Sequence, residues 1–320
     1  MAEEPYDSLF TTDFNAWVKA EVAHQDEMVA NPHIAETAKG AIEYARIGEG
    51  PVVLAIHGGP GGYDQGLLLF EWVTKFGFSL IAPSRPGYLG TPVTSGKSPA
   101  EQADLYAALL DTLGIDKVAI ICGSAGGASS YEFAIRYPKR ITALVAADAV
   151  VSKYLMPANA GPVAQALFLS GPGEKLINYF TKHYPRQSMH EFLQQESMLR
   201  PEQIDLQVEA ALKDPLQIRL LLRFSRSMSE YPKRKAGVDN DLDGLSKLDD
   251  LPVGKIQCPV LVIHGTHDSD VLFYHGVYAW ENIPGAEKMW VREGSHLCAW
   301  ISPQVHEIHA KILSFLQQHT

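Results

Sequence analysis

The sequence is poor in cysteine and lacks a long apolar run. It has three cysteines among 320 residues, Cys122, Cys258 and Cys298. This odd number without paired short spacing argues against a disulfide framework and a zinc site, and it fits reduced core thiols in a cytoplasmic protein. No apolar stretch approaches the roughly 18 residues that cross a bilayer, so we expect no membrane span.

Basic residues are also in the minority. There are 27 Lys and Arg against 37 Asp and Glu, which gives a formal net charge of −10. Because nucleic acids are polyanions, this balance predicts no nucleic-acid partner. Residues 1–8 are acidic and contain no apolar segment, so we expect no secretory signal.

What the chain does contain is an alternation of strand and helix patterns. Apolar runs predict strands at 33–38, 41–46, 52–56, 78–82, 118–122, 142–147, 259–263 and 288–292. Helical spacing is found at 14–30, 99–113 and 304–318. Such alternation predicts an α/β protein with a mostly parallel sheet, covered by helices on both faces.

The alternation is interrupted between 151 and 235, where the sequence is helical and has no strand run. We therefore expect a core domain of residues 1–150 and 236–320 and a helical cap of residues 151–235. The acidic stretch 237–244 lacks the glutamate of a calcium loop at its twelfth position, and we predict a plain loop there. Side chains of the cap that could roof a pocket, or pack the cap's own core, are Tyr154, Met156, Phe168, Tyr179, Phe180, Tyr184, Phe192 and Met198.

The most informative segment is 118–127, Val-Ala-Ile-Ile-Cys-Gly-Ser-Ala-Gly-Gly. A buried strand that turns sharply into a helix needs small residues around the turn, here Cys122 and Gly126. The turn would expose the Ser124 hydroxyl beside the first free N–H groups of the helix. Ser124 is therefore the candidate nucleophile.

A second turn, His57-Gly58-Gly59-Pro60-Gly61-Gly62, follows the strand at 52–56. It lacks the Gly-Lys-Ser/Thr ending of a phosphate loop. Its glycines would let backbone N–H groups approach a ligand. We predict an oxyanion hole from the N–H groups of Gly59 and Ala125, with His57 holding the turn by hydrogen bonds.

The base and the acid are sought after the later strands. His296 comes directly after the final strand run, where an imidazole could take the proton of Ser124. Asp268 follows the strand at 259–263 and is the first choice for the acid that orients His296. Asp270 and Asp148 are the alternative acids, and the neighbouring His264 and His267 are expected to be structural or exposed.

The order Ser, Asp, His along the chain, the Gly-x-Ser-x-Gly-like turn and the His-Gly-Gly-Pro-Gly-Gly segment resemble the α/β-hydrolase superfamily. The resemblance covers nearly the whole chain and includes Arg85-Pro86-Gly87-Tyr88. It implies an eight-stranded, mostly parallel sheet with a helical cap after the sixth strand. The glycine turn is similar to that of a cap-bearing branch with proline iminopeptidases, esterases and carbon–carbon bond hydrolases. The chain departs from the family pattern at Cys122, where the pattern has glycine.

These observations predict a cofactor-free serine hydrolase without a metal site, acting on a small carboxylic ester, lactone or related acyl compound. A proline iminopeptidase is the first alternative, since cap glutamates could bind a free α-amino group: Glu174, Glu191, Glu196, Glu202 and Glu230. Carbon–carbon bond hydrolysis or acyl transfer by the same triad is the second alternative. An inactive scaffold or ligand receptor is the third, and the complete set of triad candidates weighs against it.

Overall fold

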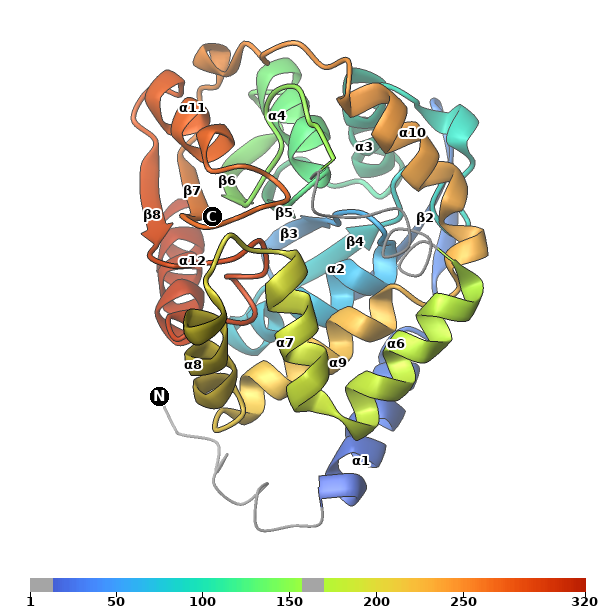
Figure 1. Ribbon diagram of the computed structural model, residues 1–320. Helices are drawn as coiled ribbons and strands as arrows, with labels where there is room; N and C mark the ends of the chain where they lie inside the picture. Colours follow the sequence, from blue (N-terminus) through green and yellow to red (C-terminus); the bar gives the residue numbers. More distant parts are fainter. Residues whose placement is uncertain (1–13, 157–169) are drawn as a thin grey trace.

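In the computed structural model, which describes residues 14–156 and 170–320, eight strands form one sheet in the order β1-β2-β4-β3-β5-β6-β7-β8 (Figure 1). Strand β2 is antiparallel to β1 and β4, and the other neighbouring strands are parallel. The strands are β1 His33–Thr37, β2 Gly40–Ile47, β3 Val52–Ile56, β4 Ser79–Pro83, β5 Val118–Gly123, β6 Ile141–Ala147, β7 Val260–Gly265 and β8 Glu287–Val291.

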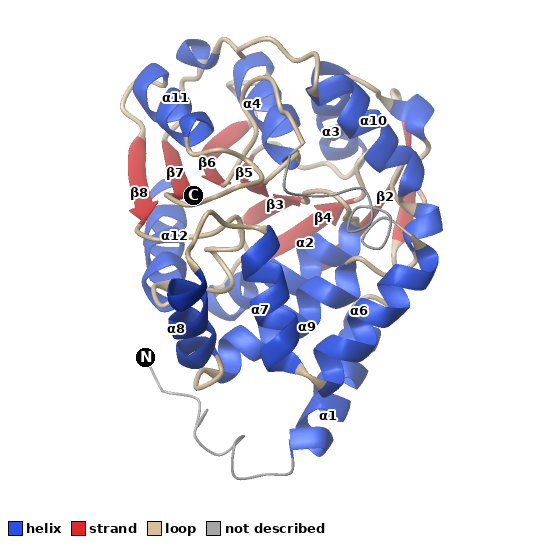
Figure 2. Ribbon diagram, viewed as in Figure 1, coloured by secondary structure: helices blue, strands red, loops and turns tan. Residues whose placement is uncertain are grey.

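Helices cover both faces of this sheet (Figure 2). Helices α3, α4 and α11 pack on one face, and α2 and α12 pack on the other. The helices are α1 Phe14–Met28, α2 Tyr63–Phe70, α3 Pro99–Thr112, α4 Gly126–Arg136, α6 Gly171–His183, α7 Pro185–Gln195, α8 Pro201–Ala211, α9 Pro215–Ser227, α10 Lys235–Leu245, α11 Tyr274–Asn282 and α12 Val305–His319.

The apolar runs of the central strands supply the core on both faces. Along β3, Val53 and Ala55 belong to the core under α2 and α12, and Leu54 and Ile56 to the core under α3 and α4. Successive side chains of a strand point to opposite faces, so a strand covered on both sides must be apolar throughout. This is why the parallel strands could be recognised from continuous apolar runs.

Helix α3 begins as its sequence predicts. The Ser98 side chain accepts a hydrogen bond from the Glu101 N–H, and the Glu101 carboxylate accepts one from the Ser98 N–H. Pro99 occupies the first turn, where no N–H is needed.

The prediction of a loop at 237–244 is wrong, because these residues lie within helix α10. Val238, Asp241 and Leu245 are buried at helical spacing. Gly237 lets the helix pack closely against Tyr88, because a Cβ at this position would come within 2.2 Å of the Tyr88 ring. The other acidic residues of this stretch lie on the exposed face of α10, whereas Asp241 is buried.

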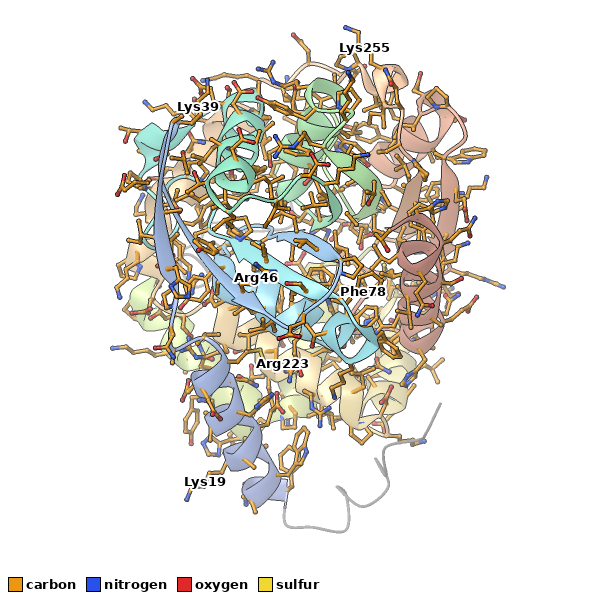
Figure 3. The ribbon with its side chains drawn as sticks, turned by 180° about the vertical axis from the view of Figure 1, so that it is seen from behind. Lys19, Lys39, Arg46, Phe78, Arg223 and Lys255 are labelled. Atoms are coloured by element: carbon orange, nitrogen blue, oxygen red, sulfur yellow. The ribbon has the colours of Figure 1, made fainter. Side chains whose placement is uncertain are left out.

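Helices α6 to α9 lie between β6 and β7 in sequence and form the lower part of the molecule in Figure 1. Helix α1 packs against α9 through Trp17 and Ile218. Arg223 of α9, labelled in Figure 3, binds Glu21 of α1 (2.8 Å). The described helices include none that is long and apolar enough to cross a membrane. The predicted cap residue Phe168 and residues 1–8 lie outside the described residues.

Candidate active site

The candidate residues lie at the carboxyl ends of parallel strands. Ser124 follows β5, Asp268 follows β7, and His296 follows β8. Because these ends meet at one edge of the sheet, the three loops converge there. Ser124, His296 and Gly59 line one cavity of about 80 Å³.

Ser124 occupies the sharp turn between β5 and α4. Its φ of 51° lies in the left-handed region, which non-glycine residues rarely adopt. The backbone around it is firmly held: Ser124 N donates to Asp148 O (3.1 Å), and Ser124 O accepts from Val150 N (3.0 Å). A Cβ at Gly126 would lie 2.5 Å from the His57 carbonyl oxygen, so only glycine fits there. The strain of the turn therefore presents the Ser124 side chain to the cavity.

Two backbone N–H groups were predicted to bind an oxyanion: that of Gly59, which lines the cavity with Ser124, and that of Ala125, which follows Ser124 in the chain. Within the described residues, neither the Gly59 N–H nor the Ala125 N–H has a hydrogen-bond partner. The neighbouring Gly58 N–H is already bound to Gln65 Oε1 (2.9 Å). Ala125 immediately precedes helix α4, so its N–H also carries the positive end of the helix dipole.

His57 holds the glycine turn, as its sequence position predicted. Its Nε2 accepts from the Arg85 N–H (2.8 Å), and its Nδ1 donates to Gly58 O (2.6 Å). Burial and the nearby Arg85 charge hold the pKa of His57 well below its ordinary value. A neutral ring with both nitrogens engaged is a support for the turn and not a base.

Two buried ion pairs anchor the same turn. Arg85 and Tyr88 both donate to Asp241 Oδ2 of α10 (2.5 Å each). Arg234 donates to Asp64 Oδ2 (2.6 Å) and to Gly61 O (2.6 Å). No pattern in the sequence singles out these ion pairs, although the helical spacing of 237–244 could have identified Asp241 as a buried residue.

Replacing Arg234 by methionine should destabilise the protein by about 3–5 kcal/mol, because the buried Asp64 carboxylate is left without its partner. The double variant R234M/D64N removes that unpaired charge and should recover part of the loss. The free energy of unfolding in urea measures both effects. A single variant within 1 kcal/mol of the wild type, roughly the value of an exposed pair, would contradict this anchoring role.

Asp268 and His296 form a close pair. His296 Nδ1 donates to Asp268 Oδ2 (2.8 Å), and Asp268 Oδ1 accepts from the Val271 N–H (2.9 Å). Although burial acts in the opposite direction, the charge of Asp268 and the adjacent Asp270 raises the pKa of His296 well above its ordinary value. The same interaction lowers the pKa of Asp268 against the effect of its burial. Asp268 is thus ionised and oriented toward His296.

The two alternative acids occupy different positions. Asp148 accepts from the Gly265 N–H (2.8 Å) and from Cys298 Sγ (3.2 Å), and burial raises its pKa to about 6. Asp270 Oδ2 lies 3.3 Å from His296 Nε2, the nitrogen on the side opposite Asp268. His296 therefore lies between two carboxylates, which the sequence did not predict.

The other candidates near the acid loop have supporting contacts. His264 is fully buried and donates from Nε2 to Val271 O (2.8 Å). His267 is half-buried and lies against Thr266 Oγ1 (3.0 Å).

The three thiols are buried and free. Burial raises the pKa of Cys122 to about 12, so this thiol is protonated and a poor nucleophile.

The helical segment contributes a mostly apolar wall to the cavity, through Phe192, Phe224 and Met228. Of the aromatic and Met side chains that could either roof a pocket or pack the core of this segment, Phe192 lines the cavity. Four others are exposed on the outside: Tyr179, Phe180, Tyr184 and Met198.

The five glutamates of the predicted cap lie in different surroundings. Glu196 lines the cavity, and burial together with the charge of Asp270 raises its pKa to about 8. Glu174 accepts from the Tyr231 N–H. The remaining three are exposed: Glu191, Glu202 and Glu230.

The family model of the alpha/beta hydrolase fold matches residues 51–300. Since this is more than half of the chain, the protein belongs to the α/β-hydrolase family. The family assignment agrees with the predicted fold and with the sheet order described above.

Individual relatives support the same assignment. The chain is 30% identical over 283 residues to the uncharacterized hydrolase YcgS of Bacillus subtilis, covering 87% of this chain and 95% of that protein. An alpha/beta hydrolase fold protein from Nakamurella multipartita has a TM-score of 0.85 and 35% identity, covering 90% of this chain and 99% of that one. A 2-hydroxy-6-oxo-6-phenylhexa-2,4-dienoate hydrolase of Comamonas testosteroni is 26% identical, and the match covers 87% of this chain and 91% of that protein. The protein is therefore similar to hydrolases along most of its length.

Proposed function

We propose that the protein is a serine hydrolase that cleaves a small, uncharged carboxylic ester or lactone. The observation that carries this proposal is the convergence of Ser124 and the Asp268–His296 pair at one cavity, which Gly59, with its free N–H, also lines. This combination supplies a nucleophile, a base, an orienting acid and an oxyanion site.

The chemistry follows from these positions. Ser124 Oγ attacks the carbonyl carbon while His296 Nε2 takes the hydroxyl proton, and Asp268 stabilises the imidazolium that forms. The N–H groups of Gly59 and Ala125 would bind the oxyanion, an interaction whose loss typically costs about 10²–10³ in rate. His296 then donates the proton to the leaving alkoxide, and water releases the acyl group from Ser124 by the same steps. None of these steps requires a cofactor.

The charge of the cavity favours a neutral substrate over an anionic one. Asp270 lines it as a carboxylate, Glu196 lines it mostly in the protonated form because its pKa is about 8, and none of the described lining residues is lysine or arginine. A dienoate, the substrate class in the name of the Comamonas testosteroni relative, carries a carboxylate that would be repelled there. We therefore place ester hydrolysis ahead of carbon–carbon bond cleavage.

We also propose that residues 151–235 act as a cap over the site. Phe192, Phe224 and Met228 from this segment form the apolar wall that would contact the acyl group. A cavity of about 80 Å³ suits a short acyl chain.

An aminopeptidase of the proline iminopeptidase type is the second candidate. Glu196 supports it, because its carboxyl group lines the cavity and, once ionised above its pKa of about 8, could bind the free ammonium group of a peptide. Of the five glutamates that the sequence offered for binding an α-amino group, Glu196 is the one that lines this cavity.

Hydrolysis of p-nitrophenyl acetate and of proline p-nitroanilide separates the two candidates. We expect the ester to be cleaved and the anilide to be left intact, with Ser124→Ala as the inactive control. Preference for the anilide would identify an aminopeptidase, and Glu196→Gln should then raise its KM. A folded enzyme that cleaves neither compound would contradict both candidates.

A further inference from the structure

The His296 ring has a carboxylate at each nitrogen. Asp268 Oδ2 accepts from Nδ1 (2.8 Å), and Asp270 Oδ2 lies 3.3 Å from Nε2. In the reaction proposed above, Nε2 must exchange the proton with Ser124 and with the leaving group. Asp270 therefore lies beside Nε2 of His296, the atom that must accept and return the Ser124 proton.

Asp270 is fixed in this place by its neighbours. Its Oδ1 accepts from the Tyr154 hydroxyl (2.5 Å), and its backbone N–H donates to Asp268 Oδ1 (2.8 Å). These two contacts come from the segment after β6 and from the acid loop itself. The carboxylate is directed at Nε2 and lines the cavity with a side chain that is 23% exposed.

We propose that Asp270 is a positioning residue: it holds the Nε2–H of His296 in the substrate-free enzyme and thereby sets the pH at which His296 is free to accept the proton of Ser124. With both carboxylates ionised, the imidazolium has an acceptor at each N–H. Loss of the Nε2 proton to solvent gives the neutral ring that can act as a base. Only the second half of this proposal, the transfer from Ser124, rests on the proposed function.

Other charged or titratable groups also face His296. Glu196 lies on the segment after α7, and its carbonyl accepts from the His296 backbone N–H (2.9 Å). Its own pKa of about 8 leaves its carboxyl mostly protonated at neutral pH, so it adds little charge there. Further titratable groups around the site are Asp148 after β6, His264 at the end of β7, Asp268 in the acid loop and Cys298, two residues after His296. None of these four groups has a contact to Nε2 in the described part of the chain, whereas the Asp270 carboxylate has one.

The test is the titration of His296 by NMR in protein with labelled histidine, in the Ser124→Ala background, with the signal assigned by its absence from His296→Gln. An opposite charge this close changes a pKa by about 1–3 units, so Asp270→Asn should lower the titration midpoint of His296 by that amount. The acid limb of kcat/KM for p-nitrophenyl acetate should move to lower pH by the same interval in the Asp270→Asn enzyme. At a fixed pH on that limb, the rate should rise about tenfold for each pH unit moved.

Glu196→Gln is the matched control, because it removes a carboxyl from the same cavity without a contact to Nε2, and it should move the midpoint less. Asp270→Glu keeps the charge and should keep the midpoint near that of the parent. Asp270→Ser provides a second neutral variant if the asparagine variant does not fold. An unchanged midpoint in a folded, neutral Asp270 variant would overturn the proposal. A lowered midpoint without ester hydrolysis in the parent enzyme would support it and overturn the proposed function alone.

Discussion

Replacing Ser124 by alanine is expected to abolish turnover and leave the fold intact. The hydroxyl lines the cavity, so its loss removes the nucleophile without opening a hole in the core. The left-handed backbone at this position is retained by the hydrogen bonds of Ser124 N and O, which alanine can form equally. Loss of the nucleophile in a serine protease costs about 10⁶ in kcat, and we expect a loss of this order.

Ser130→Ala is the matched control for this experiment. Ser130 lies in helix α4, which follows the Ser124 turn, but it is buried, its hydroxyl donates to Gly126 O (2.8 Å), and it does not line the cavity. We expect this variant to keep most of its ester hydrolysis. A Ser124→Ala enzyme with wild-type kcat would rule out an acyl-enzyme on Ser124.

Asp268→Asn should lower kcat by about 10⁴. The asparagine can still accept from the Val271 N–H, so the acid loop should keep its shape. Its amide cannot hold His296 with a proton on Nδ1 or stabilise the imidazolium, which places the wrong nitrogen toward Ser124. The measurement is kcat for p-nitrophenyl acetate, with circular dichroism to establish folding.

Asp148→Asn is the control that shows whether the loss of kcat in Asp268→Asn is specific to Asp268 or follows from neutralising any buried carboxylate at the site. Asp148 is also buried, yet it binds Gly265 and Cys298 and not the imidazole. We expect a far smaller reduction in kcat than for Asp268→Asn. If the Asp148 variant suffered the larger loss, Asp148 would be the acid partner of His296.

The sheet could be predicted from the sequence because its central strands are buried on both faces. The predicted run at 52–56 coincides with β3. The predicted runs before Ser124 and Asp268 end within two residues of the last residues of β5 and β7. Candidate residues at the ends of such strands are brought together by the parallel topology alone. This is why Ser124, His296 and Asp268 could be named without any contact information.

The second carboxylate on His296 could not be predicted in the same way. Asp270 was recognised only as an alternative to Asp268, whereas the structure places both acids on the ring. Which nitrogen each acid faces depends on the course of the loop after β7 and on the Tyr154 hydroxyl, which is 116 residues away. Glu196 is a similar case, because no local pattern distinguishes it from the other four glutamates.

Helix α10 was missed for a related reason. Its sequence is rich in Asp and Gly, which favour loops in isolation. The buried contacts of Asp241 with Arg85 and Tyr88 and the close packing of Gly237 outweigh that local preference.

The most direct test is covalent labelling of the wild-type protein with a fluorophosphonate, a reagent that phosphonylates an activated serine. We predict one adduct, located on Ser124 by mass spectrometry of the peptides, with parallel loss of ester hydrolysis and no adduct in Ser124→Ala. Full inhibition with the label on another residue and an unmodified Ser124 would contradict the proposed nucleophile.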